Sequence, residues 1–134
     1  MGYEIIEGCE SLALDEVTRL LKQTYWANRR TPEQIEASMR HSVCYGVRRA
    51  EDGYLVGFAR VITDWATTYY LCDVVIDEAF RGRGLGTALV AHITAQDAYA
   101  GLRGFLVTES AHGLYQKFGF NVVDGRFMVR PPKR

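Results

Sequence analysis

The stretch that decides the fold is EAFRGRGLGTALV, Glu78–Val90, where three glycines lie within five positions and an apolar helical pattern follows directly. Glycine lets a backbone approach a ligand closely. The first N–H groups of a helix have no intrahelical partner and carry a partial positive charge, so a loop that exposes them binds anions. With Arg81 and Arg83 at the rim, the amides from Gly82 to Thr87 are predicted to hold phosphate oxygens. The alternative is a strand-to-helix turn with surface arginines and no ligand.

Two common glycine-rich phosphate motifs do not fit this loop. A P-loop needs a lysine followed by Ser or Thr after its last glycine, whereas Gly86 is followed by Thr87 and Ala88. A dinucleotide fingerprint needs a glycine three positions after Gly84, where Thr87 stands, and it belongs to an early βαβ unit. This loop follows three consecutive predicted strands, so another ligand class is indicated.

The rest of the chain predicts a mixed α/β (α+β) sheet. Period-2 and period-3.6 apolar patterns separate its strands from its helices. The predicted strands are residues 3–8, 43–50, 55–64, 67–77, 104–110 and 121–130, with turns at Asp52-Gly53 and Asp124-Gly125. The predicted helices, about four, are residues 11–25, 31–42, 85–100 and 111–120. A chain of this length builds one core, so we expect a single domain over residues 1–134.

The composition excludes several function classes. Sixteen basic and sixteen acidic residues give a net charge of zero, which lacks the positive field of a non-specific nucleic-acid binder. No apolar run reaches the roughly 20 residues that span a bilayer, and the N-terminus is not typical of a signal peptide. Three widely spaced cysteines are typical of reduced thiols, so we expect a cytoplasmic protein with no membrane or nucleic-acid partner. No spacing of His, Cys and acidic residues is typical of a metal site.

Two motifs resemble one known family. Arg81–Gly86, RGRGLG, resembles the Arg/Gln-x-x-Gly-x-Gly/Ala signature of the GNAT superfamily, the acyl-CoA-dependent N-acetyltransferases. Leu114–Phe120, LYQKFGF, resembles its second landmark, Tyr-x-x-Phe/Leu-Gly-Phe. The order of predicted strands and helices is similar to that family over nearly the whole chain, and the chain resembles small stand-alone bacterial members. The resemblance implies the GNAT fold, with a mixed, mostly antiparallel sheet splayed at its fourth strand.

The resemblance implies acetyl-CoA (coenzyme A) as co-substrate. The loop amides would hold its pyrophosphate, and the strand before the loop would pair with the pantetheine arm and offer one amide to the thioester carbonyl. Many members have asparagine seven positions before the landmark tyrosine, where this chain has Thr108, whose hydroxyl reaches less far. The implied cofactor-binding residues are Val74, Val75, Ile76, Arg81, Gly82, Arg83, Gly84, Leu85, Gly86, Thr87 and Thr108.

Tyr115 occupies the position where family members place a tyrosine hydroxyl near the thioester sulfur. A phenol with a pKa of about 10 donates to a thiolate whose acid has a pKa of about 8.5 without a steep uphill step. The resemblance therefore implies that Tyr115 is the general acid. The alternative is a core tyrosine on a short amphipathic helix.

The attacking amine must lose a proton, and Asp73 is the first candidate base. It is an acid inside the apolar run YLCDVVI, where burial would raise its pKa toward a useful range. A local bulge would shift the face on which it lies. An aspartate satisfied by backbone bonds is the alternative, and Glu109 or a water chain are the other candidate bases.

The segment TYWANRR, residues 24–30, joins the first two predicted helices. In the fold that the resemblance implies, this segment lies beside the acceptor entrance. Trp26 would form a pocket wall, and Arg29 or Arg30 would bind a carboxylate or phosphate of the acceptor, with Glu109 also on the acceptor side. A solvated turn is the alternative for the arginines.

These features predict an acyltransferase that moves an acetyl group from acetyl-CoA to a primary amine of a small-molecule or amino-acid-like acceptor, by direct attack in a ternary complex. The alternatives are a non-catalytic acyl-CoA-binding regulatory module, acetylation of a protein amine, and an enzyme for another nucleotide. A homodimer is considered because the last predicted strand carries Phe127, Met128 and Val129.

Overall fold

The structure is a computed structural model that describes residues 2–133. Its five-stranded sheet has the order β1-β2-β3-β4-β5, in which β1 to β4 pair antiparallel and β5 pairs parallel with β4. The strands are β1 Tyr3–Glu7, β2 Val43–Arg49, β3 Leu55–Thr63, β4 Thr68–Ile76 and β5 Arg103–Phe105. The helices are α1 Leu14–Leu21, α2 Pro32–Arg40, α3 Leu85–Thr94, α4 Asp97–Ala100 and α5 His112–Gln116, with 3-10 turns η1 Cys9–Ser11 and η2 Glu78–Phe80. The predicted mixed sheet is confirmed.

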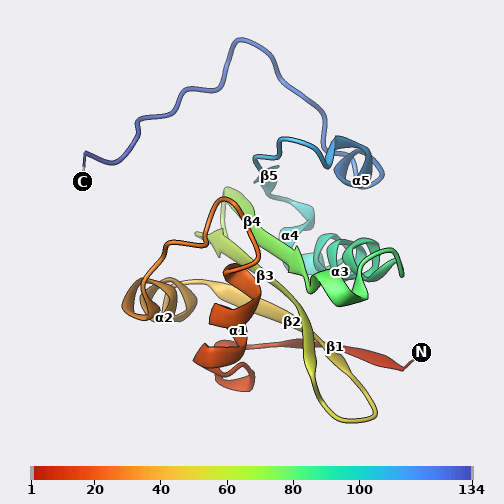
Figure 1. Ribbon diagram of the computed structural model, residues 1–134. Coiled ribbons are helices and arrows are strands. Elements are labelled where there is room, and N and C mark those ends of the chain that lie inside the picture. Colours follow the sequence, from red (N-terminus) through yellow and green to blue (C-terminus); the bar gives the residue numbers. More distant parts are fainter. Residues whose placement is uncertain (1, 134) are drawn as a thin grey trace.

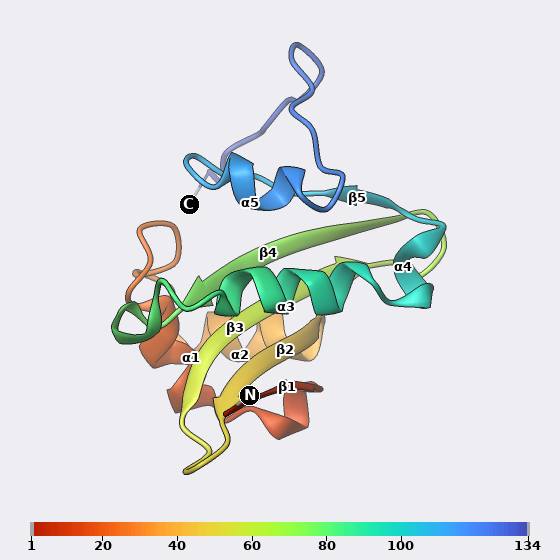
Figure 2. The same ribbon diagram turned by 90° about the vertical axis from the view of Figure 1, so that its right-hand side faces the viewer.

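The sheet separates two helical layers (Figures 1 and 2). α1 and α2 cover one face, and α3 lies across the other. Val17 and Ile35 belong to the apolar cluster beneath α1 and α2, whereas Leu89 and Ile93 belong to the cluster beneath α3. Burial of apolar side chains on both faces is the main stabilisation of such a sheet.

A capping box fixes the start of α2. The Thr31 hydroxyl accepts a hydrogen bond from the Gln34 N–H at 3.1 Å, and the Gln34 side chain accepts one from the Thr31 N–H at 2.9 Å. This capping box, with Pro32 at the first helical position, satisfies N–H groups that would otherwise be unpaired. The capping box at Thr31 therefore fixes the end of the connecting segment that carries Arg30.

A bulge in β4 at Asp73 changes which face the strand covers. The register with β3 shifts between Phe58 and Arg60, and Asp73 has a φ of 57°, in the left-handed region. Leu71 packs in the cluster beneath α3, whereas Val75 packs in the cluster beneath α1 and α2. Two residues of the same parity face opposite layers only if an extra residue interrupts the alternation.

The pairing between β4 and β5 is short. It covers only Thr68–Tyr70, and the strand predicted for residues 104–110 is reduced to Arg103–Phe105. Beyond Tyr70 the two strands diverge, and Figure 2 shows the chain after β5 running above β4 toward α5. The sheet is therefore splayed at β4, as the resemblance implied.

Two details of the prediction are wrong. The helix predicted for residues 85–100 breaks at Gln96, whose ψ of 134° is extended, so α3 and α4 are separate and the described residues hold five α-helices. No strand follows α5 up to residue 133: residues 121–133 are exposed, and Figure 1 shows them leaving the body of the protein. The predicted turn at Asp124-Gly125 is present, but the residues on either side of it form no paired strand.

Among the described helices, none is long and apolar enough to cross a bilayer.

Candidate active site

A cavity of about 840 Å³ opens where β4 and β5 diverge. Its lining comes from β4, from the segment of residues 23–30 between α1 and α2, from residues 107–115, and from the glycine-rich loop. It brings together these predicted site residues: Trp26, Arg30, Asp73, Val74, Val75, Ile76, Arg81, Gly86, Thr108, Glu109 and Tyr115.

The glycine-rich loop leads into the N-terminus of α3 with two residues of positive φ, Gly82 at 80° and Gly84 at 77°. A Cβ placed on either glycine meets no atom within 4 Å, so the space in front of the loop is open. Arg81 is exposed and lines the cavity, and its Nε donates to the Ile76 carbonyl at 3.2 Å. Arg83 is also exposed, but its Nη1 donates to the Tyr3 hydroxyl at 3.1 Å, its guanidinium packs over Phe80, and it does not line the cavity. A helix N-terminus with a cation beside it is an arrangement that can bind an anion.

Local packing holds this loop against the end of β4. Leu85 is buried in the cluster beneath α3, which fixes the first turn of the helix on the sheet. A Cβ on Gly86 would lie 3.7 Å from the Ile76 side chain. Thr87 is half-buried in the same turn. The amides that follow Gly84 therefore lie next to the last residues of β4.

Tyr115 lies half-buried on α5 and lines the cavity. Its ring packs edge-on against Phe120 at 6.2 Å between centroids, and the Phe120 N–H donates to the Tyr115 carbonyl at 3.3 Å across the turn at Gly119. Burial raises the pKa of the Tyr115 hydroxyl, so it is protonated at neutral pH and available as a donor.

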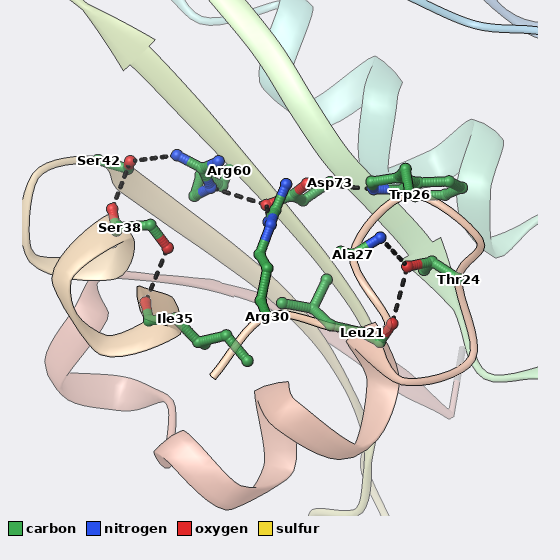
Figure 3. Close-up of polar contacts among 10 residues, drawn as sticks. All are labelled: Leu21, Thr24, Trp26, Ala27, Arg30, Ile35, Ser38, Ser42, Arg60 and Asp73. Carbon is green, nitrogen blue, oxygen red and sulfur yellow. Dashed lines mark hydrogen bonds and ion pairs between the residues drawn. The ribbon is translucent and has the colours of Figure 1, made fainter. Parts of the chain in front are cut away.

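Asp73 is buried and accepts three side-chain hydrogen bonds (Figure 3). Oδ2 accepts from Arg30 Nη1 at 2.6 Å and from Arg60 Nε at 2.8 Å, and Oδ1 accepts from Trp26 Nε1 at 3.1 Å. Burial raises the pKa of this carboxyl, but the two guanidinium groups outweigh it and hold the pKa below its usual value. The predicted rise in the pKa of Asp73 is therefore wrong, and a carboxylate in this environment is a poor proton acceptor.

The Asp73 network continues into α2. Arg60 Nη1 donates to the Ser42 hydroxyl at 3.0 Å, which donates to the Ser38 carbonyl at 2.6 Å, and the Ser38 hydroxyl donates to the Ile35 carbonyl at 2.7 Å. Figure 3 shows this chain leading from the sheet to the end of α2. Asp73 on one side and Ser42 on the other therefore fix the orientation of the Arg60 guanidinium.

The segment that carries Trp26 is held by its own turn. The Thr24 hydroxyl donates to the Leu21 carbonyl at 2.7 Å and accepts from the Ala27 N–H at 3.0 Å. Trp26 is 44% exposed and packs edge-on against Tyr25, while its indole N–H reaches Asp73. Trp26 lines the cavity, and its contribution to acceptor binding stays a prediction.

Thr108 and Glu109 line the cavity from the segment that follows β5. Partial desolvation and the nearby Glu109 carboxylate raise the pKa of the Tyr25 hydroxyl. The negative charge of Glu109 therefore lies beside the 23–30 segment. The Thr108 hydroxyl accepts from the Ala111 N–H at 3.0 Å and so caps the turn before α5.

The structure separates the two candidate arginines. Arg29 lines a second, shallower hollow of about 510 Å³ on the other side of the 23–30 segment and does not line the cavity beside β4. Arg30 lines both. A contribution of Arg29 to acceptor binding stays a prediction.

Cys44 and Cys72 do not have the properties of nucleophiles. Cys72 lines the cavity, but burial raises the pKa of its thiol to about 11, and burial raises that of Cys44 to about 12. Reactive thiols have lowered pKa values. Across residues 2–133, no cluster of His, Cys, Asp and Glu is arranged to hold a metal ion.

Among the cavity residues that were not predicted from the sequence are Arg60 and Tyr70. Arg60 is 9% exposed within the strand LVGFARVIT, in which the preceding residues are all apolar. A charged residue in a buried strand requires a partner, so that pattern was a usable signal. Tyr70 follows Tyr69 in β4 and had no distinguishing signal.

The chain belongs to the acetyltransferase (GNAT) family, whose sequence model matches residues 11–120. No curated protein sequence matches the chain.

Solved structures with the same fold are numerous. A putative GNAT acetyltransferase from Xanthomonas campestris pv. campestris is 35% identical, with a TM-score of 0.88 over 97% of this chain and 93% of that one. A GNAT family protein from Streptococcus pneumoniae is 22% identical, with a TM-score of 0.78 over 98% and 99% of the two chains. An aminoglycoside N-acetyltransferase solved with CoA is 18% identical, with a TM-score of 0.73 over 96% and 94%. The last two similarities show the fold alone.

Proposed function

We propose that the protein transfers an acetyl group from acetyl-CoA to a primary amine of a small molecule, by direct attack within a ternary complex. The observation that carries this proposal is the edge of β4 beyond Tyr70, which β5 leaves free beside a cavity lined by Tyr115 and by the glycine-rich loop. A free strand edge accepts an extended ligand, and loop amides at a helix N-terminus accept its phosphates. The CoA bound to the aminoglycoside N-acetyltransferase of the same fold supports this ligand.

Acetyl-CoA supplies an activated thioester, and the residues of this chain bind and orient it. The amides of residues 81–87 hold the pyrophosphate between Arg81 and Arg83. The backbone of residues 74–76 pairs with the pantetheine arm, and one of its N–H groups donates to the thioester oxygen as negative charge develops there. Thr108, already bonded within its turn, makes at most a secondary contact.

The proton transfers follow from the two walls of the cavity. As the amine nitrogen bonds to the acetyl carbon and the carbon–sulfur bond breaks, the Tyr115 hydroxyl gives its proton to the leaving sulfur. The proton of the attacking amine passes to Glu109 or to water. Asp73 is the less suitable base because two arginines already share its carboxylate.

The proposal is tested by thiol release from acetyl-CoA with a panel of amines, comparing the wild type with Tyr115→Phe. Removal of the hydroxyl should lower turnover about 10²-fold, the scale of a positioned acid, because the ring and its packing remain. The affinity for acetyl-CoA, measured by calorimetry, should change little.

Tyr69→Phe is the matched control. It also removes a buried tyrosine hydroxyl, but Tyr69 does not line the cavity, so turnover should be retained. Equal losses of turnover and of affinity in Tyr115→Phe would contradict the acid role. Tight acetyl-CoA binding with no thiol release for any amine would favour the regulatory module.

A further inference from the structure

The acceptor side of the cavity holds an unbalanced positive charge. Asp73 is a single carboxylate shared by the guanidinium groups of Arg30 and Arg60. The side chains are 2%, 29% and 11% exposed, respectively, so the three charges lie in a largely desolvated cluster with a surplus of one positive charge. A surplus charge away from water is unfavourable unless a counter-charge reaches it.

Arg30 is the more exposed of the two arginines that line the cavity, and it keeps more free donors. Arg60 uses Nε on Asp73 and Nη1 on Ser42, so only its Nη2 has no hydrogen bond to a described residue. Arg30 uses Nη1 on Asp73, while its Nε and Nη2 make no hydrogen bond to any residue between 2 and 133. Its guanidinium lies next to Asp73, between Trp26 and Arg60 (Figure 3). The surplus charge is therefore presented to the cavity chiefly by Arg30.

The same cavity also holds the opposite charge. Glu109 is exposed and lines the cavity, close enough to the Tyr25 hydroxyl to raise its pKa. A cavity that presents both a cation and an anion is complementary to a molecule that carries both charges.

Resting on the proposed function, we propose that the acceptor is an amine that also carries an anionic group, and that Arg30, oriented by Asp73, binds this group. Glu109 faces the ammonium end before deprotonation. A planar carboxylate or a phosphate matches the fork of donors that a guanidinium presents. Asp73 is in this scheme a positioning residue: it acts through Arg30 and through Trp26, whose indole bonds to the same carboxylate.

The test compares acceptors that differ only in the anionic group. The pairs are phenylalanine with phenylalaninamide, 4-aminobutyrate with 4-aminobutyramide, and O-phosphoethanolamine with ethanolamine. For at least one pair, kcat/KM should be tenfold or more higher for the anionic member, and the pair that responds distinguishes carboxylate from phosphate. Hydrogen bonds to a charged group are worth a factor of about ten to a hundred.

Three variants locate the effect. In the pair that shows a preference, Arg30→Gln should reduce the ratio of kcat/KM for the anionic member to kcat/KM for the neutral member to near one. The main cause should be a higher KM for the anionic member. Arg30→Lys, which keeps the charge but not the fork, should restore part of it. Asp73→Asn should raise KM for the anionic member more than for the neutral one while acetyl-CoA affinity stays the same, a split that a general loss of structure would not produce.

Arg40 serves as the control. It is exposed in the last turn of α2 and lines neither hollow, so Arg40→Gln should keep the preference for the anionic member. Loss of the preference in Arg29→Gln but not in Arg30→Gln would overturn the assignment to Arg30, as would a wild type that uses neutral and anionic members equally.

A binding measurement separates this inference from the proposed function. Calorimetry with CoA present compares N-acetylphenylalanine with its amide, and N-acetyl-4-aminobutyrate with its amide, on wild type and Arg30→Gln. Binding that depends on the anionic group and on Arg30, without turnover of any amine, would contradict the proposed transferase activity but support the anion site. Turnover without preference for the anionic member would support the transferase activity but contradict the anion site.

Discussion

At the scale of single residues, Asp73 connects three parts of the site through its backbone conformation and its carboxylate. It adopts a left-handed backbone conformation at the β4 bulge, and its carboxylate joins β3, β4 and the segment between α1 and α2. Burial and two cationic partners oppose each other in setting its pKa, and the partners prevail. The residue is therefore an ionised anchor at neutral pH.

The stability of Asp73→Asn tests this ionised state. Removal of one partner from a buried ion cluster costs about 3–5 kcal/mol, so the free energy of unfolding at pH 7 should fall by about that amount. Because the pKa of Asp73 is lowered in the folded state, its stabilisation is complete above the unfolded value near 3.8 and is lost as the pH falls through the lower folded value.

Urea unfolding of wild type and Asp73→Asn from pH 7 to pH 3 measures this. The difference between them should stay constant down to about pH 5 and shrink below pH 4. A wild type that gains stability over the variant between pH 7 and pH 5 would instead indicate a raised pKa, and would return Asp73 to the role of base.

At the scale of elements, the glycine-rich loop and α3 act as one unit. The positive φ of Gly84 is what bends the chain into the helix, and no side chain lies in front of it. The β4 bulge and the short β5 complete the arrangement, because they leave the strand edge next to the loop unpaired. Two irregularities of the sheet therefore form the side of the cavity where we propose that acetyl-CoA binds.

Gly84→Ala and Gly84→Asp form a matched pair for this unit. Both place a Cβ at positive φ, which should cost about 1 kcal/mol of stability in each. Only the aspartate adds a negative charge where phosphate is expected, so the Kd for acetyl-CoA should be at least about tenfold higher in Gly84→Asp than in Gly84→Ala. Calorimetry of both variants decides this, and equal Kd values would show that the loop holds no phosphate.

At the scale of the whole molecule, the C-terminal segment does not join the body of the protein. Residues 121–133 are exposed, including Val122, Phe127 and Met128 at 61%, 63% and 93%. An apolar surface of this kind marks an interaction site in soluble proteins. The homodimer considered from the sequence therefore stays a prediction, now with a defined candidate surface.

Size-exclusion chromatography with light scattering tests the homodimer. The full chain should elute with the mass of two copies, and a chain ending at Phe120 should elute with the mass of one while keeping its circular dichroism spectrum. The truncation removes no described residue of either apolar cluster, because the cluster beneath α3 extends no further than Phe120 and the other no further than Val75. A full chain that runs as a monomer at micromolar concentration would exclude this role for the segment.

Features with a local cause were predictable from the sequence. The capping box at Thr31, the turns at Gly53 and Gly119, and the glycine-rich entry to α3 depend on residues a few positions apart, so their patterns are visible in the chain itself. The resemblance to the GNAT family likewise rests on two short motifs, and the family is confirmed. Tyr115 and Arg81 were found by the same route.

Features that depend on distant residues were decided only by the tertiary structure. The direction of the pKa shift of Asp73 depends on Arg30 and Arg60, 43 and 13 positions away, and no local pattern shows that both reach it. The separation of Arg29 from Arg30 likewise arises from how the segment folds against β4. Strand propensity at residues 121–130 did not produce a strand, because the segment leaves the body of the protein and pairs with no edge of the sheet, and propensity without a paired neighbour does not make a strand.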